Sequence, residues 1–178
     1  MLRQLTLTQD DHRIARLTAA AIAIALVESA VPSPLPGVKP GLANIITLLV
    51  LLRYDWATAA WVTLLRVLAV SLLVGQFLAP GFMLSLGGAV ASLGVLYLAQ
   101  PLVRQMPTWF GPVTLSILAA LAHMMMQLLI VRLWLVPSSG VWVLAPVFMG
   151  AALLFGTLNG LIVAWIGSGP RAADPAPQ

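Results

Sequence analysis

The chain has 178 residues, of which 61% are hydrophobic and only 8% are charged. Soluble domains are about 25% charged, so this composition excludes a water-soluble globule, whose surface needs far more polar groups. The formal net charge is +4, but the basic residues lie between apolar runs, so they indicate membrane topology rather than nucleic-acid binding. The absence of cysteine excludes disulfides and thiol chemistry.

Apolar runs of membrane-spanning length cover nearly the whole chain and predict an all-α integral membrane protein of one domain with about six transmembrane helices. The runs cover residues 14–30, 41–52, 57–77, 82–100, 113–135 and 141–166. We expect residues 1–13 to form a cytoplasmic leader and residues 167–178 a disordered cytoplasmic tail. The first run is not a signal peptide, because Glu28 stands where a cleavage site needs a small residue.

The second run is unusually short. At about 12 residues it rises only about 18 Å, well below the roughly 30 Å hydrocarbon core. Residues 31–40 directly before it contain four prolines, which forbid a regular helix. We therefore expect this segment to enter the membrane, where irregular backbone is tolerated only if it is buried in protein or lines a polar cavity.

The distribution of basic residues predicts that both termini face the cytoplasm. Six arginines would then lie inside: Arg3, Arg13, Arg16, Arg53, Arg104 and Arg171. Only Lys39 and Arg132 would lie outside. Because cytoplasmic loops carry an excess of Lys and Arg, this count favours an N-in/C-in, multi-pass protein of the inner (cytoplasmic) membrane.

Several polar residues fall between the middle of the membrane and its outer face. They are Glu28, Lys39, Asn44, Arg66, Ser85, His123 and Gln127. Arg66 lies near the middle of a span, where a charge costs at least about 2.5–3.5 kcal/mol, and we expect Glu28 to be its counter-ion. Together with Lys39 and the amides that begin the second span, Arg66 would suit an anionic or hydrogen-bond-accepting ligand.

The same residues have purely structural interpretations. Glu28 and Arg66 could form an ion pair that only fixes helix packing. His123 and Gln127 share a helix face and could simply hydrogen-bond a neighbouring helix. A ladder of small residues, Ala15, Ala19 and Ala23, has the spacing for close helix contact, although such spacing arises easily by chance in an alanine-rich helix.

Four features resemble the Gx transporter family, whose members are often labelled heptaprenyl diphosphate synthase component I: residues 28–44 (ESAVPSPLPGVKPGLAN), Arg66, residues 82–88 with Ser92, and His123 with Gln127. That family is similar to the substrate-binding S-components of energy-coupling factor transporters. The resemblance implies an S-component-like bundle of six helices with an outward-facing site gated by residues 31–43. It also implies that the alanine ladder docks onto a transmembrane coupling subunit driven by separate ATPases.

We expect a membrane transporter component that binds a small polar or anionic organic solute from the outer side and is energised by partner subunits. The alternative is a non-catalytic membrane subunit of an isoprenoid, quinone or redox assembly. We expect no enzyme activity, because prenyl-chain elongation needs clustered aspartates to hold Mg²⁺ and the nearest candidates, Asp10 and Asp11, lie in the leader. We expect no metal site, no cofactor and no nucleic-acid partner.

Overall fold

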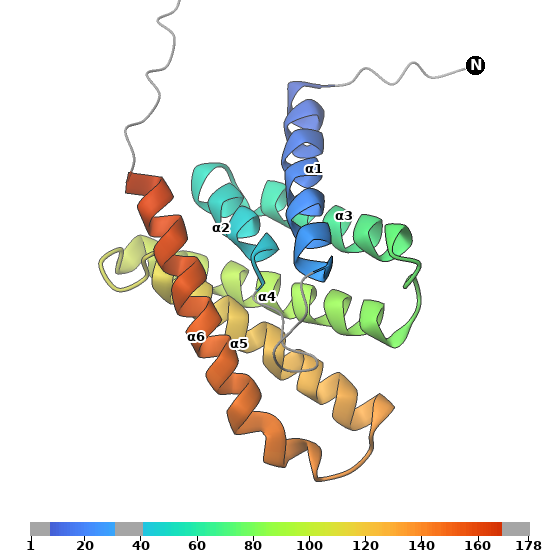
Figure 1. Cartoon of the computed structure of the whole chain (residues 1–178). Coiled ribbons are helices and arrows are strands. Elements are labelled where there is room, and N and C mark those ends of the chain that lie inside the picture. The colour runs from blue at the N-terminus through green and yellow to red at the C-terminus, as the bar shows by residue number, and fades with distance from the viewer. Residues whose placement is uncertain (1–7, 31–40, 169–178) are drawn as a thin grey trace, which may run out of the picture.

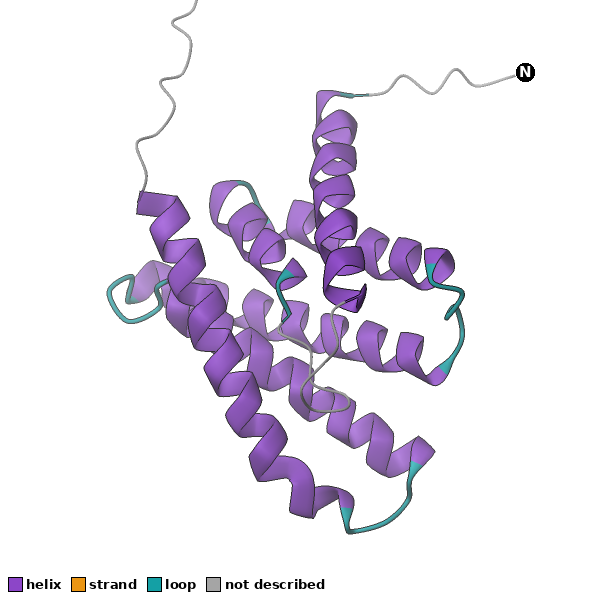
Figure 2. Cartoon of the chain, in the orientation of Figure 1, coloured by secondary structure: helices purple, strands orange, loops and turns teal. Residues whose placement is uncertain are grey.

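The computed structural model describes residues 8–30 and 41–168, and within these ranges it contains helices and loops but no strand (Figure 1, Figure 2). These residues form six α-helices: α1 (Gln9–Ala30), α2 (Ala43–Arg53), α3 (Trp56–Leu73), α4 (Pro80–Gln105), α5 (Pro112–Ile130) and α6 (Val141–Ser168). A π-helix, η1 (Val131–Leu135), continues α5. The predicted all-α fold is confirmed.

Four stretches of the described chain are long and apolar enough to cross a membrane, namely α3, α4, α5 with η1, and α6. They match the last four predicted runs closely, which confirms a multi-pass membrane protein. Helix α2 has 11 residues, and at 1.5 Å per residue it rises about 17 Å. It therefore is too short to cross the bilayer alone, as the sequence predicts.

Helix α1 begins at Gln9, earlier than the predicted start at residue 14. The N–H of Thr8 donates to the Asp11 carboxylate at 2.8 Å, and the N–H of Asp11 donates to the Thr8 hydroxyl at 3.2 Å. Such reciprocal capping satisfies amides that have no partner inside the helix, so the helix extends beyond the apolar run into the predicted leader. Its charged first turns set α1 apart from the four long apolar stretches.

The helices pack as two groups of three. Helix α1 lies against α2 and α3, and α5 lies between α4 and α6. The two groups meet where α3 contacts α4 and where α2 contacts α5 and α6. In Figure 1, α1 stands across α3, whereas α5 and α6 run side by side. The short helix α2 thus touches members of both groups.

Glycines on α6 allow that helix to approach α5 closely. A Cβ placed on Gly160 would lie 2.6 Å from the Cα of Val113, and one on Gly156 would lie 3.1 Å from the Cα of Ile117. The atoms in the way belong to the backbone, which cannot move aside as the end of a side chain can. Small residues are the usual means of close helix contact in membranes.

The outer surface of the bundle is apolar. The side chains of Trp165, Val143 and Leu98 are 78%, 77% and 70% exposed. Soluble monomers rarely leave such extensive apolar surface in contact with water. This surface is therefore suited to contact with lipid.

Replacing Gly160 with alanine should destabilise the protein by about 1–3 kcal/mol, because the added methyl group would overpack the contact with Val113. Gly150→Ala on the same helix is the matched control, since a Cβ there meets no atom within 4 Å. Thermal unfolding in detergent should show a lower midpoint for Gly160→Ala alone. Equal midpoints for the two variants would contradict the close packing of α5 and α6.

Candidate functional site

Three helices meet at the backbone of Gly41, just before α2. Its N–H donates to the Glu28 carboxylate of α1, and its C=O accepts a hydrogen bond from Asn159 Nδ2 of α6 at 3.3 Å. Gly41 has φ +70°, a conformation that other residues rarely adopt. We call Glu28, Gly41 and Asn159 the Gly41 junction. The two side chains are buried, so the junction is enclosed by protein.

Arg66 of α3 lies buried beside this junction. Its side chain donates a hydrogen bond from Nη2 to Asn44 Oδ1 of α2 at 3.2 Å, whereas its Nε has no partner among residues 8–30 and 41–168. A guanidinium group carries five N–H donors. The described residues therefore leave part of its hydrogen-bonding capacity unused.

The predicted ion pair between Glu28 and Arg66 is not a direct one. Within residues 8–30 and 41–168, the only ion pair shorter than 4.0 Å joins Arg13 and Asp10. The Glu28 carboxylate accepts a hydrogen bond from the Gly41 N–H, and the Arg66 guanidinium donates one to Asn44. The two charges still lie close enough to interact electrostatically, but each is held by a neutral partner from the start of α2.

An internal cavity adjoins the Gly41 junction and is lined by residues of α2, α3, α4, α5 and α6. Half of its lining side chains are polar, namely Asn44, Thr47, Thr63, Ser92, Ser116 and Asn159. The hydroxyls of Thr47 and Thr63 are hydrogen-bonded to each other at 2.8 Å. The space for the centre of a water-sized sphere is about 20 Å³, which is room for about one water molecule.

His123 of α5 packs directly on α4. A Cβ on Gly88 would lie 2.6 Å from the imidazole ring, so a larger residue there would force the ring to shift. The Ser92 hydroxyl lies 2.9 Å from the carbonyls of both Gly88 and Ala119 and 3.4 Å from His123 Nδ1. A hydroxyl has one hydrogen, and Ser92 donates it to a carbonyl because a carbonyl can only accept. Toward His123 the Ser92 oxygen can therefore only accept, which requires a proton on Nδ1.

Gln127 holds the other side of the same imidazole ring. Its Nε2 lies 3.1 Å from His123 Nε2 and 3.5 Å from the carbonyl of Leu84. The carbonyl can only accept, so the amide presents its NH₂ group at this point. His123 Nε2 is then the acceptor, and both contacts favour the tautomer that carries its proton on Nδ1.

The structure separates the predicted site residues into two groups. Three lie together around the start of α2, namely Glu28, Asn44 and Arg66. His123 and Gln127 form the second group, which reaches the cavity through Ser92. Their contacts with Leu84 and Ser92 on α4 match the structural interpretation, hydrogen bonding to a neighbouring helix. Two residues join neither group: Ser85 is exposed and outside the cavity lining, and Lys39 lies outside the described residues.

Four polar residues of the cavity lining were not predicted from the sequence: Thr47, Thr63, Ser116 and Asn159. Asn159 carried a usable signal, because an amide in the middle of an apolar span is expensive unless it is hydrogen-bonded. Thr and Ser carry a weaker signal, since their hydroxyls can bond to the backbone of their own helix. Only the packing of the helices shows that these hydroxyls meet.

The alanine ladder of α1 faces outwards. Ala15, Ala19 and Ala23 are all exposed, whereas the buried residues of this helix are Thr18, Ala21 and Glu28. The small-residue spacing therefore does not serve the packing of α1 against α2 and α3. Residues 31–40 of the predicted gating segment lie outside the described residues.

The sequence was compared with known protein families, curated proteins and solved structures. The family described as heptaprenyl diphosphate synthase component I matches residues 17–166. No curated protein and no solved structure matches the chain. The family match includes α2 to α5 in full and most of α1 and α6, so both groups of site residues lie inside it.

The tautomer of His123 can be measured directly. The chain has two histidines, so His12→Gln leaves His123 as the only source of imidazole signals. Nitrogen NMR of the detergent-solubilised variant, at a pH where the ring is neutral, should show a protonated Nδ1 and an unprotonated Nε2. Adding Gln127→Leu removes the donor to Nε2 and should weaken this preference. A proton on Nε2 in the His12→Gln protein would contradict the assigned network.

Proposed function

The chain belongs to the heptaprenyl diphosphate synthase component I family, and we propose that it is the solute-binding component of a membrane transporter. The proposed ligand is a small anionic or polar organic molecule that enters from the outer side of the cytoplasmic membrane. The Gly41 junction, Arg66 and the adjoining cavity form the proposed site. Partner subunits supply the energy for transport.

The incompletely paired guanidinium of Arg66 is the observation that carries this proposal. A buried charge is expensive unless it is paired and hydrogen-bonded, yet the described residues give Arg66 one hydrogen bond to a neutral amide. Arginine matches carboxylate and phosphate groups in both charge and geometry. An anionic ligand would therefore complete the interactions that the protein leaves open.

The lining of the cavity supports a small polar ligand rather than a lipid. Its hydroxyl and amide groups can both donate and accept hydrogen bonds, and Arg66 adjoins it through the hydrogen bond to the lining residue Asn44. The present cavity is limited to about 20 Å³. We propose that the lining helices separate to admit the solute and that the structure represents a closed state.

The proposed role is binding rather than catalysis. Diphosphate chemistry requires several carboxylates to hold Mg²⁺. Glu28 is the one carboxylate among the residues assigned here to the site, and it is engaged by the Gly41 amide. In the described ranges, no three His, Cys, Asp or Glu side chains converge in a way that could hold a metal ion.

The proposed topology has six membrane-inserted segments with both termini in the cytoplasm. The six segments are α1, α2 and the four long apolar stretches. The arginine distribution gives their orientation. In this orientation the Gly41 junction lies in the outer half of the membrane. The exposed ladder of Ala15, Ala19 and Ala23 lies in the inner half and is the proposed contact with a transmembrane coupling subunit.

Arg66→Gln tests the proposed site, because glutamine can still hydrogen-bond Asn44 but carries no charge. Small anions that co-purify with the detergent-solubilised protein should be identified by mass spectrometry, and their affinities measured for both proteins. The variant should bind at least about tenfold more weakly, since a hydrogen bond to a charged group contributes about 1.5–3 kcal/mol. Asn44 is a less suitable target, because its loss would also remove the partner of Arg66.

Ser85→Ala is the control for this measurement, because Ser85 is an exposed polar residue of α4 outside the cavity lining. A Thr47→Val, Thr63→Val double variant tests the cavity itself. It removes both members of one hydrogen-bonded pair at nearly constant volume and should leave stability almost unchanged. Equal ligand affinity in wild type, Arg66→Gln and the double variant would exclude this site.

Ala19→Trp tests the coupling contact. Ala19 is exposed at the centre of the ladder, so a bulky ring there should block close approach of a partner helix while leaving the fold and the distant site intact. Affinity purification from membranes should recover the coupling subunit and its ATPases with the wild type and lose them with the variant. Leu133→Trp, at an exposed position on η1, is the control for bulk alone. Unchanged recovery with Ala19→Trp would contradict docking through the ladder.

A further inference from the structure

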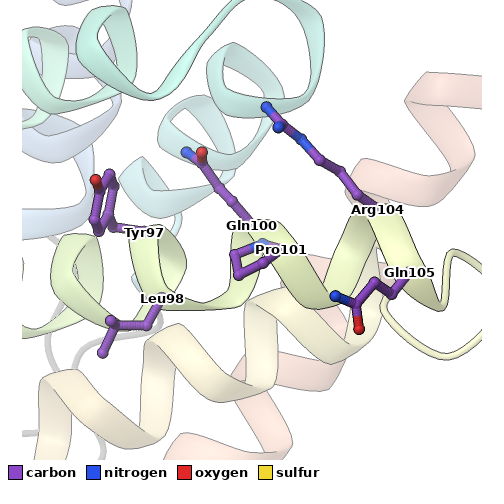
Figure 3. A pocket seen from close by; sticks show the side chains of 6 residues that line it. All are labelled: Tyr97, Leu98, Gln100, Pro101, Arg104 and Gln105. Carbon is purple, nitrogen blue, oxygen red and sulfur yellow. The ribbon is translucent and has the colours of Figure 1, made fainter.

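A groove follows the C-terminal half of α4 on the outside of the bundle (Figure 3). Its lining residues are Tyr97, Leu98, Gln100, Pro101, Arg104 and Gln105, and its volume is about 380 Å³. None of them lines the polar cavity. The groove is therefore a separate feature from the proposed solute site.

The length of α4 indicates that its C-terminal end, which carries the groove, reaches the headgroup layer. Helix α4 has 26 residues, a rise of about 39 Å that exceeds the roughly 30 Å core. Its polar groove residues, Gln100, Arg104 and Gln105, are all in its last two turns. Trp109 follows with 77% of its side chain exposed, and exposed tryptophan is typical of the membrane interface.

The two ends of the groove differ in chemistry. Leu98 and Tyr97 are 70% and 56% exposed and give the deeper end an apolar surface. Arg104 is exposed at the other end, and in Figure 3 its side chain extends from the same side of α4 as that of Gln100. Pro101 lies between the ends and has no N–H, so the Tyr97 carbonyl loses its usual helical donor.

Arg104 supplies a positive charge that no carboxylate of the described residues neutralises through an ion pair. Within residues 8–30 and 41–168, the only ion pair joins Arg13 and Asp10. No carboxylate lines the groove. The single positive charge of the Arg104 guanidinium matches the single negative charge of a phosphodiester. Arginine binds such phosphate groups through paired N–H donors.

We propose that this groove binds one bilayer phospholipid with a net negative charge. Its phosphodiester contacts Arg104, with the amide group of Gln100 beside it on the same side of α4. An acyl chain continues past Pro101 along the apolar surface of Leu98. The order of polar and apolar residues along α4 thus follows the order of headgroup and chain in a lipid of the adjacent leaflet.

Native mass spectrometry in detergent tests this proposal, with dioleoyl phosphatidylglycerol as the probe and dioleoyl phosphatidylcholine as the zwitterionic reference. Arg104→Gln should bind the phosphatidylglycerol about fivefold more weakly than wild type, the contribution expected of one arginine near an anionic lipid. Phosphatidylcholine should lose less affinity, because its choline cation offsets the charge of the phosphodiester. Leu98→Trp, which obstructs the apolar end without altering charge, should also weaken phosphatidylglycerol binding.

Arg132→Gln is the matched control, because Arg132 lies on η1 outside the groove. It should bind phosphatidylglycerol as wild type does. Equal weakening by Arg104→Gln and Arg132→Gln would overturn the proposal in favour of general attraction to a positively charged chain. Unchanged binding in Arg104→Gln, or in Leu98→Trp, would overturn it as well. Displacement of the lipid by inorganic phosphate at matched ionic strength would show a simple anion site instead.

Discussion

The backbone N–H of Gly41 lies just before α2, outside the hydrogen bonds of that helix, and hydrocarbon would offer it no partner. This constraint explains why charged and amide side chains converge at Gly41. Glu28 accepts the N–H of Gly41, and Asn159 donates to its carbonyl. Because α2 is too short to cross the membrane, its start must lie inside protein, and helices α1 and α6 provide the enclosing groups. The junction between the two halves of the bundle follows from this requirement.

The same requirement explains why Glu28 and Arg66 do not pair directly. Each charge is used to satisfy or orient a group at the beginning of α2, Glu28 through the Gly41 amide and Arg66 through Asn44. A direct ion pair would leave those neutral groups without partners, and a buried polar group without a partner costs about 1–3 kcal/mol. The two charges are therefore distributed over a polar network in which no described residue pairs with the Nε of Arg66.

Helix α4 separates two environments of opposite character. Its inner face carries Ser92, which lines the enclosed polar cavity and touches His123. Its outer face carries Leu98 and Arg104, which line the open groove. A small solute and a lipid would thus bind on opposite sides of one helix. Family membership is compatible with both, because the membrane helices that it covers supply all of these residues.

The sequence by itself determined the class of protein and the positions of most helices. Long apolar runs predict helices in a membrane because every backbone amide must be satisfied locally there, and α3 to α6 begin and end close to the predicted bounds. The short length of the second run was also predicted correctly from the sequence. The start of α1 was not, because it depends on hydrogen bonds between Thr8 and Asp11 rather than on hydropathy.

Only the tertiary structure decided which polar groups meet. Glu28, Asn44 and Arg66 could be marked as costly in a membrane from the sequence alone, but their partners depend on the distances between helices. Thr47 and Thr63 show the same limit, since each hydroxyl could have bonded to its own helix and the two instead bond to each other across α2 and α3. Hydropathy measures what a residue costs to bury, whereas helix packing decides which neighbour offsets that cost.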